Sequence, residues 1–322
     1  MSRVEILPLT LERILEVEVF FQKLPYHLTD WDASLSIDAR ARLARINVEK
    51  ELTDGVGFVA IDSGNTVGVF MLTPSKWDTE YFGVKMGRVT IFCAPHIQAA
   101  NALTKKLREQ IRKMKFEHVY TVLDSRDKIA SLALQNSGWH VVWASLRQIC
   151  KPKSVDTSGF LTSHGSLELV KYEPSHLPKL IEIASRLTEY TWLQHEERLP
   201  IDRRLNYAVE LTRNSCTTDF ADVSLTLLDN GRPTGFNSSK LFQHPPEVGT
   251  TRYTYERNTF VDPNLQGKGY GKFLEQAVIK HLYPLVDYIT GRVAAQSVGM
   301  LRMLESAGFK SYGCELYLVF ES

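Results

Sequence analysis

A glycine-rich segment, Phe260-Val261-Asp262-Pro263-Asn264-Leu265-Gln266-Gly267-Lys268-Gly269-Tyr270-Gly271, gives the first indication of how this chain folds. The residues before it predict a strand over 251–261, and apolar residues at helical spacing after it predict a helix over 271–283. A strand, a glycine-rich turn and a helix in direct succession form an anion site. The first N–H groups of the helix have no partners within it, and the helix dipole favours negative charge at that end.

The glycines and lysines of this turn favour a phosphate ligand. Gly267, Gly269 and Gly271 carry no Cβ, so the main chain can approach a ligand closely, and Lys268 and Lys272 add positive charge. We therefore expect a pyrophosphate here; a plain surface turn is the alternative. A Rossmann dinucleotide site is not indicated, because its glycine motif follows the first strand of its unit, whereas this turn follows the third strand of a meander.

The second half of the chain has the pattern of a mixed α/β domain. Its expected strands are 167–171, 223–228, 233–242, 251–261, 288–293 and 311–320, and its expected helices are 175–188, 203–213, 271–283 and 297–306. Asn230-Gly231 marks a hairpin turn, and Pro284 ends the third helix. The order β-α-α-β-β-β-α-β-α-β predicts a mixed sheet flanked by helices, an α/β fold of the α+β mixed-sheet kind.

The first half repeats the end of this pattern. A strand over 119–123, a helix over 127–136, the pair Gly138-Trp139 and a strand over 140–149 correspond to the final strand, helix and strand around Gly308-Phe309. A repeat of domain length indicates a duplicated domain rather than a solenoid.

We therefore expect two tandem domains, 1–150 and 166–322, joined by a linker, 151–165, whose Pro, Gly, Ser and Thr are typical of linkers. The positions that correspond to the glycine turn hold His96, Ile97, Ala99 and Asn101, at the start of an expected helix over 96–114. Side chains would crowd the phosphate position there. The first domain is therefore expected to lack a cofactor site.

Composition narrows the class of protein. The chain has 322 residues, 43% of them hydrophobic and 23% charged, with a formal net charge of +1, which indicates a soluble globular protein and argues against nucleic acid or a membrane as partner. No window is long and apolar enough for a signal peptide or a membrane span. The four cysteines lie far apart, which predicts reduced thiols and a cytoplasmic protein, and no histidine spacing indicates a metal. Homodimerisation stays open.

Phe260–Gly271 resembles the acyl-CoA motif of the GNAT superfamily, whose pattern is Gln/Arg-x-x-Gly-x-Gly/Ala, and Ser297–Phe309 resembles that family's next motif, which ends in Gly-Phe. The resemblance implies two tandem GNAT-like domains, the N-terminal one degenerate, and an acyl-CoA co-substrate, either acetyl-CoA or a short hydroxyacyl-CoA. The implied cofactor-binding residues are Phe260, Val261, Gln266, Gly267, Lys268, Gly269, Tyr270, Gly271 and Lys272.

The reaction implied is direct attack of a neutral amine on a thioester. The backbone N–H of Val261 is implied as a donor to the tetrahedral oxyanion. Tyr255 and Glu256 are candidates for proton transfer, and strict strand alternation places them on opposite faces; a solvated strand residue is the alternative for Glu256. GNAT enzymes often use a tyrosine to protonate the leaving thiolate, and Leu304 stands at that position. Either the acid lies elsewhere, or the thiolate leaves unaided, or the protein is not catalytic.

A narrower resemblance concerns the acceptor. Trp77–Arg88 and Ser185–Pro200 are similar to segments of nucleotide-sugar N-acyltransferases of the TDP-fucosamine type. This implies a dTDP- or UDP-linked amino-deoxy-sugar as acceptor and a part in surface polysaccharide biosynthesis, such as that of lipopolysaccharide. The implied acceptor-binding residues are Trp77, Tyr81, His195, Arg203, Arg204, Arg292 and Gln296.

Aromatic rings and arginines suit such an acceptor. Trp77, Tyr81 or Trp192 would stack on the base, and Arg203 or Arg204, on an expected helix over 190–207, would pair with the diphosphate. The alternatives are core aromatics and a solvated charged face. At the level of function, the alternatives are transfer to another small-molecule or peptide amine and a non-catalytic acyl-CoA-binding protein.

Overall fold

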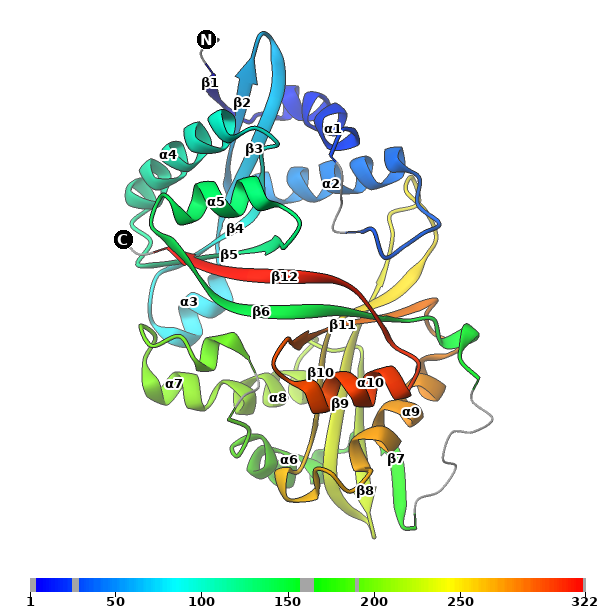
Figure 1. The fold of residues 1–322 in the computed structure, drawn as a ribbon. Coiled ribbons are helices and arrows are strands. Elements are labelled where there is room, and N and C mark those ends of the chain that lie inside the picture. Colours follow the sequence, from blue (N-terminus) through cyan, green and yellow to red (C-terminus); the bar gives the residue numbers. More distant parts are fainter. Residues whose placement is uncertain (1–3, 25–28, 157–164, 189–190, 321–322) are drawn as a thin grey trace. The chain divides into compact units, whose positions relative to one another are not determined.

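The computed structural model describes residues 4–24, 29–156, 165–188 and 191–320, apart from the side chains of residues 256 and 257. The chain forms two compact units, each of which combines a sheet with helices (Figure 1). Unit 1 consists of Met1–Ala144, Pro245–Gly249 and Gly313–Ser322, and unit 2 of Ser145–His244 and Thr250–Tyr312.

Unit 1 has a mixed sheet in the order β1-β2-β3-β4-β5-β12, in which only the β4–β5 pairing is parallel among the described strands. Its strands are β1 (Glu5–Pro8), β2 (Val56–Asp62), β3 (Asn65–Pro74), β4 (Met86–Cys93), β5 (His118–Asp124) and the later part of β12 (Lys310–Phe320). Its helices are η1 (Leu11–Arg13), α1 (Ile14–Gln22), α2 (Ile37–Leu52), α3 (Lys76–Phe82), α4 (Ile97–Met114) and α5 (Lys128–Gln135).

The alternation of side chains along β3 divides the core of unit 1 into two layers. Phe70 and Leu72 pack with α4 and α5, whereas Val69 and Met71 pack with α1 and α2. Successive side chains of a strand point to opposite faces, so one apolar strand supplies both layers.

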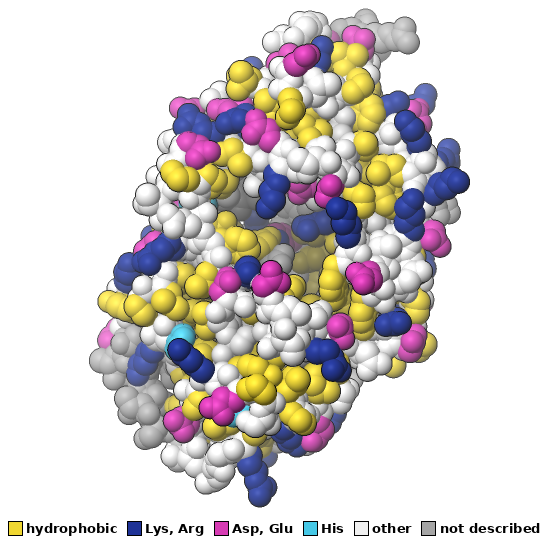
Figure 2. Space-filling model, turned by 180° about the vertical axis from the view of Figure 1, so that it is seen from behind, with side chains coloured by type: hydrophobic (Ala, Val, Ile, Leu, Met, Phe, Trp, Pro, Cys, Tyr) yellow, Lys and Arg dark blue, Asp and Glu magenta, His cyan; other side chains and the backbone are white. Residues whose placement is uncertain are grey.

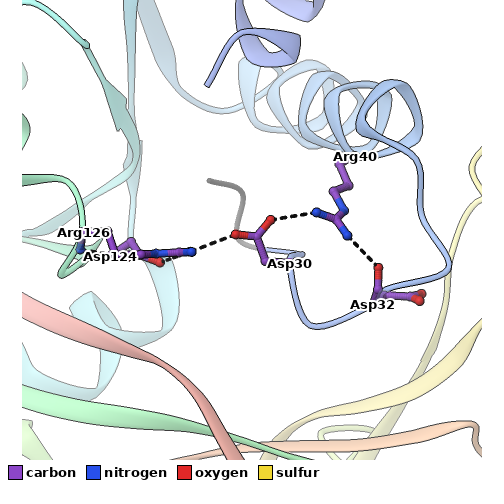
Figure 3. A network of polar contacts seen from close by, with 5 residues as sticks. All are labelled: Asp30, Asp32, Arg40, Asp124 and Arg126. Carbon is purple, nitrogen blue, oxygen red and sulfur yellow. Dashed lines mark hydrogen bonds and ion pairs between the residues drawn. The ribbon is translucent and has the colours of Figure 1, made fainter. Parts of the chain in front are cut away.

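A network of charged side chains connects the segment before α2 to the sheet of unit 1 (Figure 3). Arg40 of α2 donates to Asp30 Oδ1 at 3.0 Å and to the carbonyl oxygen of Asp32 at 3.1 Å. Arg126 Nη2 donates to Asp30 Oδ2 at 2.9 Å and to Asp124 Oδ2 at 2.8 Å. Asp124 is 5% exposed, and a buried charge of this kind is tolerated only when it is paired. These charges therefore have a structural role.

Unit 2 has a sheet in the order β6-β11-β10-β9-β8-β7. Its strands are the later part of β6 (Trp139–Cys150), β7 (Leu167–Lys171), β8 (Val223–Asp229), β9 (Arg232–Gln243), β10 (Arg252–Val261) and β11 (Tyr288–Ala294). Its helices are η2 (Pro152–Ser154), η3 (Pro174–His176), α6 (Leu177–Ala184), η4 (Trp192–Gln194), α7 (Ile201–Leu205), α8 (Tyr207–Thr217), η5 (Pro263–Leu265), α9 (Tyr270–Leu282) and α10 (Val298–Ser306).

The two faces of this sheet are covered by different helices (Figure 1). Phe236 and Phe260 are buried against α6, in a cluster that also includes residues of α8. Val261, the next residue along β10, is buried instead among the apolar side chains of α9 and α10. The strand that leads into the glycine turn therefore has one face towards α6 and α8 and the other towards α9.

Each unit is completed by a strand segment from the other half of the sequence. The later residues of β6 pair antiparallel with β11, from Ser145↔Ala294 to Cys150↔Ile289. The later residues of β12 pair antiparallel with β5, from Glu315↔Asp124 to Phe320↔Val119. The compact units therefore exchange their last strands and do not follow the linear halves of the sequence.

The surface shown in Figure 2 carries Lys and Arg side chains interspersed with Asp and Glu, in keeping with the formal net charge of +1. Within the described ranges, no group of three or more His, Cys, Asp or Glu side chains is arranged to hold a metal ion. None of the described helices has the length and hydrophobicity to cross a membrane.

Candidate functional site

The glycine turn lies between the end of β10 and the start of α9, as the sequence predicted. Gly267 and Gly269 have φ angles of 75° and 89°, in the left-handed region that favours glycine. Gly269 is the N-cap residue of α9. The turn thus uses two glycines for its conformation, and not only for close approach.

The backbone of this turn is open to a ligand. The Phe273 N–H donates to the Gly269 carbonyl oxygen at 3.0 Å, so the N–H groups of residues 270–272 precede the first hydrogen bond of the helix. A Cβ added at Gly267 would meet no atom within 4 Å, and one added at Gly271 would meet only Met303 Cε, at 4.0 Å. Orphan N–H groups at an uncovered helix start form a site for phosphate oxygens.

Side chains around the turn fix its shape. Asp262 Oδ1 accepts from the Asn264 N–H at 3.0 Å, while Asp262 Oδ2 accepts from Arg186 Nη2 at 2.9 Å. The Lys268 ammonium donates to the Asn264 carbonyl oxygen at 3.0 Å. Gln266 and Lys272 are exposed. The sequence did not single out the Arg186–Asp262 pair, although an Asp-Pro-Asn segment is a signal for a side-chain-stabilised turn.

Tyr270 ties the start of α9 to β8. Its hydroxyl donates to Asp229 Oδ2 at 2.6 Å, and this hydrogen bond raises the pKa of Tyr270. Two hydrogen bonds hold the pKa of the Asp229 carboxyl below its usual value, the one from the Ser166 hydroxyl with the larger effect and the one from Tyr270 with the smaller. The first turn of α9 is thereby held in place before any ligand binds.

The strand before the turn carries a bulge. Tyr255 is opposite Lys240 of β9, but Asn258 is opposite Ser238, so β10 has one extra residue between these pairs. On its other side β10 is parallel to β11, with pairs at Tyr253↔Tyr288 and Thr254↔Ile289. Among the described residues of the two strands, no pairing continues beyond Thr254. The two strands therefore separate on the way to the glycine turn.

The Val261 N–H points into this separation. The next N–H, that of Asp262, donates to the Thr234 carbonyl oxygen on β9 at 2.8 Å. Successive N–H groups of a strand point to opposite sides in the plane of the sheet, so the Val261 N–H points away from β9, to the side of β11. A donor in this position suits a thioester oxygen that lies between the strands.

Tyr255 and Arg292 meet across the two strands. Arg292 Nη2 donates to the Tyr255 hydroxyl oxygen, and the Arg292 guanidinium carbon lies 4.6 Å from the centre of the Tyr255 ring. The structure thus brings together one predicted catalytic residue and one predicted acceptor residue. The side chain of Glu256, the other candidate for proton transfer, lies outside the described residues, and Gln296 is exposed in the turn between β11 and α10.

Leu304 is 3% exposed and packs in the apolar core of unit 2 with Phe309. A leucine at this position cannot transfer a proton. Any acid for the leaving thiolate must therefore come from another residue.

The predicted acceptor residues lie in two places. Trp77 and Tyr81 belong to α3 of unit 1, where their rings stack with centroids 5.4 Å apart and planes at 2°. His195 and Arg203 are exposed in unit 2, while Arg204 Nη1 donates to the Gln194 carbonyl oxygen at 3.2 Å and so has a structural contact.

Two expectations about this region are wrong. Trp192 is 8% exposed and cannot serve as an open stacking surface. The expected continuous helix over 190–207 is broken, because η4 ends at Gln194 and α7 begins only at Ile201, after Pro200, which stands at the N-cap of α7 and cannot continue a helix from the residues before it. Residue 190 lies outside the described residues.

The start of α4 in unit 1 stands where unit 2 has its glycine turn. His96 is the N-cap residue of α4, with φ −121° and ψ 133°, and its side chain makes no capping hydrogen bond. Ala99 and Ala100 are buried in the core. This helix start has none of the glycines that open the backbone of unit 2.

Comparison with known proteins agrees with this geometry. Residues 177–309 match the Acetyltransferase (GNAT) family. This part of unit 2 is therefore similar to a GNAT acetyltransferase domain, and that family uses an acyl-CoA such as acetyl-CoA as its acyl donor. No curated protein matches the chain significantly.

Solved structures extend the likeness of fold to nearly the whole chain. A tandem GNAT protein from the clavulanic acid biosynthesis pathway is 14% identical, with a TM-score of 0.60 and coverage of 98% of both chains. A GCN5-related N-acetyltransferase from Sphaerobacter thermophilus is 13% identical, with a TM-score of 0.60 and coverage of 98% of this chain and 95% of that one. The expected fold class, a mixed α/β chain with two tandem GNAT-like domains, is confirmed.

Proposed function

We propose that this protein is an N-acyltransferase that moves an acyl group from acyl-CoA to the amine of a nucleotide-linked amino-deoxy-sugar. One observation carries the acyl-CoA part: an open glycine turn starts a helix directly after a bulged strand that leaves its neighbour. This arrangement lies within the residues that match the GNAT family. The N–H groups of residues 267–271 would hold the pyrophosphate of acetyl-CoA or a short hydroxyacyl-CoA.

The chemistry needs a donor for the developing oxyanion. In this proposal the Val261 N–H donates to the thioester carbonyl oxygen as negative charge develops on it. The acceptor nitrogen forms the new C–N bond, the C–S bond breaks, and the sulfur leaves with the bonding electron pair. A sugar amine has a pKa near 8, close to that of an α-amino group, so about a fifth of it is neutral at pH about 7.4, far more than of a lysine side chain.

Tyr255 is our candidate for the proton transfers. Its oxygen accepts a hydrogen bond from Arg292, so its own proton remains available to another acceptor. The phenol donates this proton to the leaving sulfur and takes one from the attacking amine, which balances the reaction. The Arg292 guanidinium stabilises the negative charge on the phenol oxygen between the two steps. Tyr255 thus replaces the acid that Leu304 cannot supply.

The acceptor class rests on two segments of the sequence, Trp77–Arg88 and Ser185–Pro200. Arg203 of unit 2 is exposed and offers a charge for a phosphate of the nucleotide, while the part of the Trp77–Tyr81 stack of unit 1 stays a prediction from the sequence. The product would be an N-acylated sugar for a surface polysaccharide, such as lipopolysaccharide.

A panel of acceptors tests this proposal. The full chain is incubated with acetyl-CoA or 3-hydroxybutanoyl-CoA and with dTDP- and UDP-linked amino sugars, simple amines or peptides, and thiol release is followed. We expect turnover with a nucleotide amino sugar. Turnover with simple amines or peptides alone would contradict the sugar acceptor and leave the acyl transfer intact. CoA binding without any turnover would favour a non-catalytic acyl-CoA-binding protein.

A further inference from the structure

Asn258 of β10 has a buried carboxamide that bonds to nothing in the described structure. Its side chain is 5% exposed, and neither Nδ2 nor Oδ1 has a hydrogen-bond partner. Buried polar groups in native proteins are nearly always bonded, so each exception needs a physical reason, such as a ligand or a water molecule.

The neighbouring polar side chains of these strands do have partners. Asn237 Nδ2 donates to Thr259 Oγ1 at 2.6 Å, and Ser238 Oγ donates to Ser215 Oγ of α8 at 3.1 Å. The unbonded amide is therefore a property of the Asn258 position and not of this part of the sheet.

The bulge of β10 places Asn258 on the same face as Tyr255. Their partners on β9, Ser238 and Lys240, are two residues apart and so lie on one face of that strand. Without the extra residue, Tyr255 and Asn258 would point to opposite faces. Asn258 also lies shortly before Val261 in the same strand, β10. Its amide thus stands on the face of the proposed proton-transfer residue, next to the point where β10 separates from β11.

We propose that the Asn258 carboxamide binds a neutral polar group of the acceptor, one that can both donate and accept a hydrogen bond. A hydroxyl next to the reacting amine is such a group, whereas an alkylamine has none. A carboxamide also suits a neutral partner better than a charged one, which a carboxylate or a guanidinium would bind more strongly. Asn258 thereby selects a hydroxylated amine, which deepens the acyl transfer proposed above and rests on it.

The first test compares Asn258→Leu with wild type on two acceptors, dTDP-4-amino-4,6-dideoxygalactose and its 3-deoxy analogue. A site built around a hydroxyl rejects the analogue that lacks it by a large factor. We expect wild type to prefer the hydroxylated sugar in kcat/KM by about 100-fold or more, and Asn258→Leu to lose nearly all of this preference through KM. The Kd for CoA should not change. A variant that keeps the wild-type preference would overturn the inference.

The second test does not depend on the acceptor. Leucine has the same branched arrangement of heavy atoms as asparagine and replaces only the unbonded polar atoms by methyl groups, so Asn258→Leu should melt at or above the wild-type temperature. Asn237→Leu is the matched control, because it breaks the bond to Thr259 and should melt several degrees lower. If Asn258→Leu melts as low as Asn237→Leu, the amide is bonded within the protein and the inference is wrong. Failure of all nucleotide sugars as acceptors, with Asn258→Leu as stable as wild type, would count against the sugar alone.

Discussion

Gly271→Ala separates the stability of the helix from its capacity to bind phosphate. Gly271 is the second residue of α9 and does not have a left-handed φ. An added Cβ would meet no atom nearer than Met303 Cε, at 4.0 Å, so the substitution introduces neither strain nor a clash. Alanine is favoured over glycine in a helix by up to about 1 kcal/mol, which corresponds to a rise in melting temperature of about 2–4 °C.

The same methyl group should leave CoA binding intact, because the acyl-CoA pattern that this turn resembles accepts either glycine or alanine at position 271, and alanine keeps its backbone N–H. The loss of even one hydrogen bond to a charged phosphate would cost about 1.5–3 kcal/mol and weaken binding by about 10- to 150-fold, so we expect the Kd for CoA to change by less than about 10-fold. Isothermal titration calorimetry with CoA and a thermal melt measure the two effects on one preparation.

Gly64→Ala is the control for this experiment. Gly64 lies in the β2–β3 turn of unit 1 with φ 79°, and an added Cβ would meet nothing within 4 Å. Its left-handed conformation should cost about 1–2 kcal/mol of stability, without effect on CoA. The two variants thus change stability in opposite directions and should both keep wild-type CoA affinity. A folded Gly271→Ala protein that binds CoA more than about 10-fold more weakly than wild type would refute our assignment of the turn to this pattern.

Four further results are expected. Gly269→Val should abolish CoA binding, because it combines a strained φ of 89° with a side chain at the phosphate position, and wild-type affinity in a folded variant would contradict this. A fragment of residues 165–322 should be insoluble or weakly active, because it lacks the part of β6 that pairs with β11, and full activity would argue against strand exchange as a requirement. Arg203→Ala should raise the acceptor KM by about 10- to 150-fold with CoA affinity unchanged, and an equal loss of both would point to misfolding. Hydrogen bonding from the Arg252 N–H lowers the pKa of Asp287, so the contribution of this carboxylate to stability is present above about pH 4 and is lost as the pH falls further. In urea unfolding, Asp287→Asn should reduce the fall of the unfolding free energy at acid pH by less than about 1 kcal/mol. An unchanged dependence of the unfolding free energy on pH would contradict this.

Local signals made much of unit 2 predictable. Three glycines after an apolar strand predicted the turn and the helix that follows it, and the apolar residues of 167–171 predicted β7 with the bounds that the structure shows. Such features depend on the conformational preferences of a few adjacent residues. By contrast, the breaks at Pro200 and after Ala184 shortened the expected helices, because the apolar spacing continues past the point where the helix ends.

The pairing of strands was not available from the sequence. An apolar strand pattern gives the faces of β6 and β12 but does not identify the strands they pair with, so their exchange between the units was missed. The bulge in β10 was missed for a related reason, since strict alternation places Tyr255 and Asn258 on opposite faces. The unbonded amide of Asn258 depends on every group around it, and no local pattern could have identified it.

A crystal structure of the full chain with acetyl-CoA tests the central claim most directly. We predict one molecule per chain, with its pyrophosphate oxygens within hydrogen-bonding distance of the backbone N–H groups of residues 267–271 and its thioester oxygen facing the Val261 N–H. Acetyl-CoA bound instead at the start of α4, or bound in unit 2 with its pyrophosphate away from the glycine turn, would contradict the account.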